Sequence, residues 1–92
     1  MKQYYKNNRA VRYITMTESK YNFINDDIKI DIKSLPEVLQ EAIGRAEQAD
    51  KDNDLVSYVT YGDNIDIVAK NCCADGAITQ KIWDDLLRRY VL

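Results

Sequence analysis

Acidic residues cluster in this 92-residue chain at a spacing that could bind a calcium ion. Asp50, Asp52 and Asp54 match the first three ligand positions of an EF-hand loop. Such a loop also needs glycine at its sixth position and glutamate at its twelfth, where this chain has Leu55 and Tyr61. The sequence therefore predicts solvated loop acids and helix caps in this stretch, with no metal bound.

Other acidic groups also lack the patterns of a calcium site and of an acid–base catalytic pair. An EF-hand alignment centred on Gly76 fails because Ile82 takes the glutamate position. The adjacent pairs Asp26–Asp27 and Asp84–Asp85 do not form the converging carboxyl pair that a glycosidase needs. The chain has no histidine, and it contains no phosphate-binding loop or nucleophile elbow. We therefore expect no enzymatic activity, no catalytic residue and no cofactor.

The two cysteines, Cys72 and Cys73, are adjacent. Neighbouring cysteines rarely form a disulfide with each other, because the ring is strained. On a helix their side chains diverge by about 100°, so they do not readily share one metal ion. We expect reduced thiols, with Cys72 buried and Cys73 more exposed. The chain also lacks an apolar run of about 20 residues and an N-terminal signal core, so the sequence predicts a cytoplasmic protein outside the membrane.

Basic and aromatic residues mix in the first twenty residues, which carry five basic side chains against one acidic side chain. Bases neutralise phosphates, and exposed tyrosines can stack on nucleobases. This pattern suggests nucleic-acid binding as an alternative function. The candidate contacts are Lys6, Arg9, Arg12 and Tyr13.

The first third of the chain has the composition of β-strands. Residues 10–17 are rich in β-branched and aromatic side chains, and Ile28, Ile30 and Ile32 alternate with charged residues. We therefore expect an antiparallel hairpin or small sheet over about 10–33, after a polar and flexible tail at 1–9.

Helices are predicted over the rest of the chain. A capping box at Ser34–Glu37 and a regular apolar stripe predict a helix over about 35–49. Residues 54–61 fit a strand or a helix, and we prefer a helix because its apolar stripe continues into a helix at about 64–74. A final helix is predicted over about 80–90, capped by Thr79 after a left-handed Gly76. Together these elements predict one α+β domain spanning 1–92, with three to four helices.

The last predicted helix carries large apolar side chains on one face: Trp83, Leu87 and Tyr90. They can fill the chain's own core or bind another protein, since large aromatic residues are common anchors of interfaces. The sequence therefore favours a non-enzymatic interaction or accessory module that binds a copy of itself or another protein, with these three residues as the candidate interface.

The C-terminal segment resembles a known type of helical hairpin. Gly76-Ala77-Ile78-Thr79, followed by Trp83 and Leu86-Leu87, is similar to the short C-terminal (SHOCT) hairpin over residues 72–90. That resemblance implies a terminal scaffold that supports oligomerisation. The whole chain also resembles small bacterial proteins carried by mobile elements, which implies an accessory role in the cytoplasm.

Overall fold

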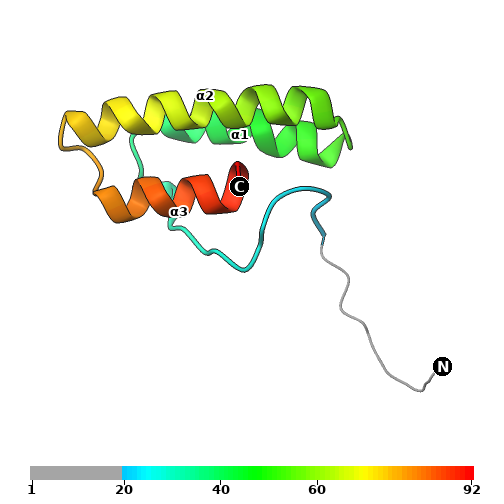
Figure 1. The fold of residues 1–92 in the computed structure, drawn as a ribbon, viewed down its shortest axis with the longest axis horizontal. Helices are drawn as coiled ribbons and strands as arrows, with labels where there is room; N and C mark the ends of the chain where they lie inside the picture. The colour runs from blue at the N-terminus through cyan, green and yellow to red at the C-terminus, as the bar shows by residue number, and fades with distance from the viewer. Residues whose placement is uncertain (1–19) are drawn as a thin grey trace, which may run out of the picture.

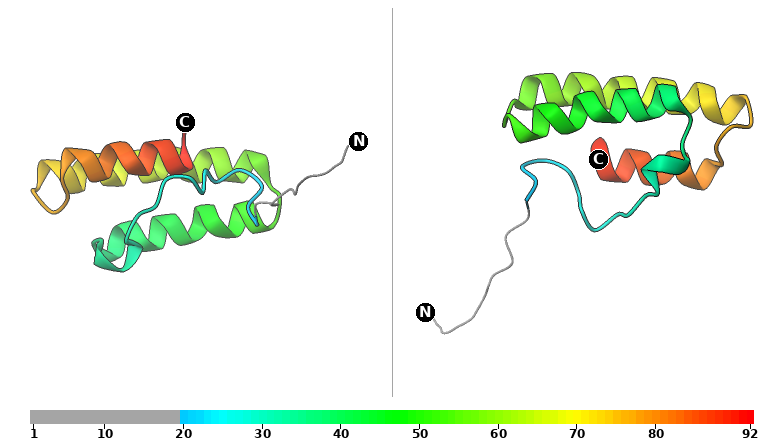
Figure 2. Two further views of the ribbon diagram at one scale, coloured as in Figure 1. Left: turned by 90° about the horizontal axis from the view of Figure 1, so that it is seen from below. Right: turned by 180° about the vertical axis from the view of Figure 1, so that it is seen from behind.

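The computed structural model of the chain describes residues 20–92. A short 3-10 turn, η1 (Ile32–Ser34), precedes three helices: α1 (Glu37–Lys51), α2 (Leu55–Ala74) and α3 (Gln80–Tyr90). The helix α2 packs against both α1 and α3 (Figure 1). Residues 20–35, which we call the strap, run along the gap between α1 and α3 (Figure 2).

The prediction of an α+β fold is wrong, because residues 20–92 contain helices and no strand. Residues 10–19 of the predicted sheet lie outside the described part of the chain. Within the strap, Ile28, Ile30 and Ile32 are half-buried while the charged residues between them are exposed, so burial does alternate along it. An extended segment that lies on helices meets the same alternation as a strand on a sheet. Its periodicity therefore indicated one buried face without indicating a strand partner.

The first helix begins two residues later than predicted. Ser34 does not cap it, because the Ser34 hydroxyl instead donates a hydrogen bond to the carbonyl oxygen of Asp31 at 2.7 Å. Pro36 is the residue before the helix, and its carbonyl oxygen accepts the first helical hydrogen bonds, from the N–H groups of Leu39 and Gln40. Proline suits the start of a helix, where no N–H partner is needed.

The two predicted segments 54–61 and 64–74 form one continuous helix, α2. The preference for helix over strand at 54–61 was right, and the expected interruption before residue 64 was wrong. Asp54 caps the helix by accepting a hydrogen bond from the Ser57 N–H at 3.2 Å. The caps on either side of the turn between α2 and α3 are as predicted. Thr79 accepts the Ile82 N–H at 3.2 Å at the start of α3, and Gly76, just after the end of α2, has a φ of +80°.

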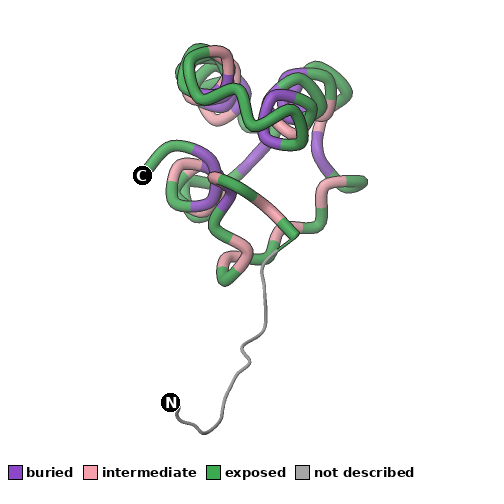
Figure 3. The backbone as a smooth tube through the Cα atoms, turned by 90° about the vertical axis from the view of Figure 1, so that its right-hand side faces the viewer, coloured by how far each residue is buried: buried purple, intermediate pink, exposed green. Residues whose placement is uncertain are grey.

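The core forms where the three helices and the strap meet, and buried stretches of the backbone face one another there (Figure 3). Three buried alanines on α1 are small enough to let neighbouring elements approach closely, while larger side chains from the other elements fill the centre. The buried apolar residues are Ile24, Leu35, Leu39, Ala42, Ile43, Ala46, Ala49, Tyr58, Ile65, Ala69, Cys72, Ile78, Leu86 and Tyr90.

Two glycines inside helices provide a matched test of the packing between α2 and α3. A Cβ atom on Gly62 would lie 3.2 Å from the Tyr90 carbonyl oxygen, whereas a Cβ atom on Gly44 would meet nothing within 4 Å. Gly44→Ala is therefore expected to raise the free energy of unfolding by about 0.5–1 kcal/mol, through helix propensity alone. The free energy of unfolding of Gly62→Ala should be at least about 1 kcal/mol lower than that of Gly44→Ala. Urea denaturation of both variants measures the difference, and equal stabilisation would contradict the close approach.

Candidate functional site: the strap clasps and the outer face of α2

A buried carboxylate on α1 holds the start of the strap. Asp50 is only 2% exposed, and its Oδ1 accepts hydrogen bonds from the backbone N–H groups of Asn22, Phe23 and Ile24 at 3.1, 2.5 and 3.1 Å. The Asn22 side-chain amide also donates to the Asp50 carbonyl oxygen at 2.6 Å. The carboxylate thus takes the place that a neighbouring strand would have in satisfying this backbone. Asp50 is structural, which corrects the prediction of a solvated loop acid at this position.

A buried arginine on α3 holds the middle of the strap. Arg89 is 6% exposed, and its Nη1 donates to the carbonyl oxygen of Ile28 at 2.8 Å and to the Asp26 carboxylate at 3.3 Å. Its Nη1 also lies 3.4 Å from the Asn25 carbonyl oxygen, and the Asn25 N–H donates back to the Arg89 carbonyl oxygen at 2.9 Å. The guanidinium and the main chain of one residue therefore both fix the strap to α3.

Two buried tyrosines lie beside Asp50 and Arg89, the two residues that hold the strap and that we call its clasps. Burial raises the pKa of Tyr58 and that of Tyr90 to about 12 in each case, so both phenols are protonated at neutral pH. The Tyr90 hydroxyl donates to Glu47 at 3.3 Å and accepts from Nε of Arg89 at 3.1 Å. Neither phenol acts as a base near neutral pH. The Tyr90 hydroxyl bonds to the fold itself, whereas the buried Tyr58 hydroxyl has no hydrogen-bond partner in the part of the chain that the structure describes.

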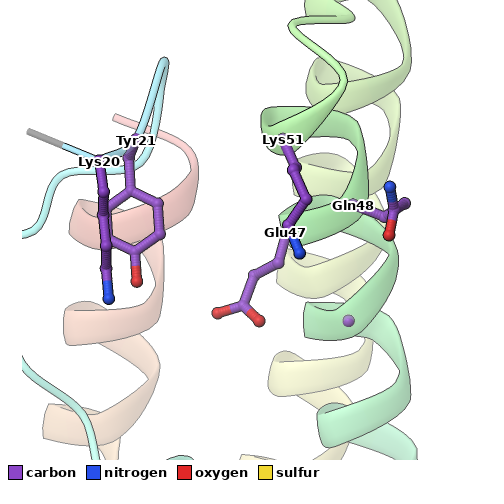
Figure 4. Close-up of a pocket in the computed structure, with 6 residues that line it drawn as sticks. Lys20, Tyr21, Glu47, Gln48 and Lys51 are labelled. Atoms are coloured by element: carbon purple, nitrogen blue, oxygen red, sulfur yellow. The ribbon is translucent and has the colours of Figure 1, made fainter.

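A hollow of about 520 Å³ opens between the start of the strap and α1 (Figure 4). Lys20 and Tyr21 form one wall, and Glu47, Gln48 and Lys51 project from α1 on the other. Its charged groups are of both signs, so they do not select one class of small ligand.

The acidic residues and cysteines that the structure describes do not come together as a metal site. No group of three or more acids and cysteines is arranged to hold a metal ion within residues 20–92. Asp54 caps α2, and Asp52 accepts a hydrogen bond from the Gln48 side chain. Cys72 is buried and Cys73 half-buried, and both thiols are free. Burial raises the pKa of Cys72, which keeps its thiol protonated and unreactive at neutral pH.

The candidate interface residues on α3 lie largely against the chain's own core. Tyr90 is buried, and Trp83 and Leu87 are half-buried. The ring of Trp83 packs against the core, and its indole N–H donates to the Asp66 carboxylate on α2 at 2.9 Å. The candidate nucleic-acid contacts Lys6, Arg9, Arg12 and Tyr13 all lie outside the described residues.

A different helix face exposes aliphatic side chains to solvent. On α2, Val56 is 79% exposed, Val59 53% and Ile67 60%, all pointing away from the buried stripe of the same helix. We call this surface the outer α2 face, and its exposed residues are Val56, Val59, Thr60, Asp63, Ile67, Lys70 and Ala74. The prediction of this helix depends on a single apolar stripe along it. Val56 and Ile67, which lie outside that stripe, were the signal that could have revealed this face. Val59 was counted in the stripe, and the structure exposes it.

Comparisons with protein-family models, with curated proteins and with solved structures found no match to this chain. The similarity of residues 72–90 to a SHOCT hairpin therefore stays a prediction. In the part of the chain that the structure describes, no helix combines the length and apolar character required to cross a membrane.

Proposed function

We propose that the chain is a small non-enzymatic interaction module that binds another protein chain through the outer α2 face. One observation carries this proposal: Val56, Val59 and Ile67 expose more than half of their surface on one side of a single helix. Their opposite neighbours on α2, such as Ile65 and Ala69, are completely buried. A helix that is apolar on both sides is normally covered on both sides.

The surroundings of these aliphatic residues also suit an interface. Thr60, Asp63 and Lys70 lie among them and are exposed. Protein interfaces typically place apolar residues at the centre and polar or charged residues at the rim, where they fix the orientation of the partner. By contrast, the buried polar groups Asp50 and Arg89 bond to the strap, which gives them a role in folding.

The nucleic-acid alternative depends on Lys6, Arg9, Arg12 and Tyr13, and no contact in the described residues adds support to it. The interaction hypothesis is therefore the one that we develop. We place the contact residues on the outer α2 face and not on α3, because the aliphatic side chains on α2 are more exposed than the candidate interface residues on α3.

Site-specific photo-crosslinking tests the proposal directly. A photoreactive residue at position 59, on the outer α2 face, is expected to crosslink to a second polypeptide in cells that express the full chain. The same residue at position 45, which is exposed on α1, provides the control. Adding Ile67→Asp should abolish the crosslink from position 59, because a buried charge opposes association. Equal crosslinking from positions 59 and 45 would contradict an interface on α2.

A further inference from the structure

The outer α2 face contains a regular stripe along the whole helix. Successive members are alternately four and three residues apart, which keeps them on one side through consecutive turns. All of them are exposed: Val56, Thr60, Asp63, Ile67, Lys70 and Ala74. Two helices with such stripes can pack side by side at a shallow crossing angle of about 20°.

The charges on this stripe are arranged symmetrically about its apolar centre. Asp63 lies four residues before Ile67, and Lys70 lies three residues after it. Neither charged side chain forms an ion pair with any residue in the described range 20–92. The order acid, aliphatic, base is complementary to its own reverse, so it matches a second α2 helix that runs in the opposite direction.

Only one simple register uses this complementarity. When a two-fold axis passes beside Ile67, each Ile67 packs on its counterpart, and Asp63 of each copy lies level with Lys70 of the other. In the same register Thr60 lies level with the small side chain of Ala74. The pairing thus contains one aliphatic contact at its centre and an ion pair on each side of it.

The competing arrangements place like charges together. An antiparallel register centred on Asp63 brings Val59 against Ile67 but sets the two Asp63 carboxylates face to face. A parallel pair sets Asp63 against Asp63 and Lys70 against Lys70. Like charges that are directly opposed across an interface disfavour these alternatives.

We infer that the partner of the outer α2 face is a second copy of this chain, bound antiparallel about a two-fold axis beside Ile67. This inference rests on the proposed function and names its partner. The shared surface is a single face of a helix about 30 Å long. We expect two such faces to bury less accessible area than the roughly 1,200 Å² of a tight complex. The dimer is therefore a reversible one, with a dissociation constant in the range of about 10 µM to 1 mM.

A charge-swap cycle on the purified full chain tests both the partner and the register. Asp63→Lys alone and Lys70→Glu alone each convert two ion pairs into two like-charge pairs, so each should raise the dimer dissociation constant about tenfold. The double variant restores opposite charges and should return to within about threefold of wild type. Glu41→Lys, at an exposed position on α1, changes the charge by the same amount as Asp63→Lys. It should change the dimer dissociation constant by no more than about twofold.

Disulfide trapping gives a second readout of the same register. Ile67→Cys should form an intermolecular disulfide under mild oxidation, since its counterpart lies directly across the axis. The yield of intermolecular disulfide in Val56→Cys should not exceed the wild-type background from Cys72 and Cys73. The reason is that the two copies of position 56 lie about 30 Å apart in this register. Trapping at position 56 instead of position 67 would overturn it.

The outcomes separate this inference from the proposed function. If the double charge swap fails to restore dimerisation after both single variants weaken it, the antiparallel register is wrong. If the pure chain stays monomeric to near-millimolar concentration while position 59 crosslinks to a different protein, self-pairing is wrong and the proposed interaction surface stands. Restoration by the double variant, together with trapping at position 67, supports the inference.

Discussion

Asp50→Ala is expected to lower the free energy of unfolding by about 3–4 kcal/mol. The carboxylate accepts hydrogen bonds from three consecutive backbone N–H groups, of Asn22, Phe23 and Ile24, and is itself 2% exposed. Alanine removes the acceptor and leaves these donors without a partner at the edge of the core. Because small domains are stable by only about 5–15 kcal/mol, this loss is a large share of the total.

Urea denaturation and hydrogen exchange together check this result. The amide hydrogens of residues 22–24 should lose protection in Asp50→Ala before those of α1 do, because the strap is released first. Asp52→Ala is the matched control, since the exposed Asp52 carboxylate accepts a hydrogen bond only from the Gln48 side chain among residues 20–92. Its effect should stay within about 0.5 kcal/mol. If Asp50→Ala also lowered the free energy of unfolding by no more than about 0.5 kcal/mol, Asp50 would not hold the strap.

Arg89→Met is expected to cost about 2–4 kcal/mol of stability. Methionine keeps much of the apolar stem but removes every donor of the guanidinium. The Ile28 carbonyl oxygen loses its partner. The Asn25 carbonyl oxygen and the Asp26 carboxylate each lose one bond and keep the Ile28 N–H and Lys29, respectively. Arg89 is 6% exposed, so water does not readily replace it.

The neighbouring residue provides the control for this second prediction. The Arg88 side chain is 60% exposed, and its only ion pair in the described part of the chain is a long one with Asp85 at 3.7 Å. Arg88→Met should therefore change stability by less than about 0.5 kcal/mol. Trp83 fluorescence in urea follows both variants, because the ring packs between α3 and the core. Equal stabilities for the two variants would contradict the role of Arg89 as the clasp on α3.

Local signals made the C-terminal elements predictable. The cap of α3 uses Thr79 and the left-handed turn uses Gly76, and each depends on residues close to it in sequence. The inward stripe of α1 was also visible, because apolar residues recurred at helical spacing. The start of α1 was misplaced since Ser34 bonds backward to the Asp31 carbonyl oxygen in place of the helix.

The strap could not be predicted from neighbouring residues. Its first backbone donors bond to Asp50, which lies 26 to 28 residues further along the chain. Its middle bonds to Arg89, which lies more than 60 residues away. Alternation at Ile28, Ile30 and Ile32 suits an extended segment on any apolar surface. Only the tertiary arrangement shows that helices, and not a sheet, supply that surface.

The outer α2 face was missed for a related reason. Aliphatic residues occur on both sides of α2, so its inward stripe is not the only apolar face in its sequence. Which side stays open depends on where α1 and α3 pack. Once those two helices cover Ile65 and Ala69, Val56 and Ile67 are left facing solvent.

Sedimentation equilibrium of the purified full chain is the most direct test of an α2 face that pairs with its own copy. The account predicts a mass that rises from 10.7 kDa at low micromolar concentration towards twice that value near 1 mM. Ile67→Asp should stay at 10.7 kDa throughout, while Val38→Asp, an aliphatic residue 51% exposed on α1, should behave as wild type. A wild-type mass of 10.7 kDa over the whole range would contradict the account.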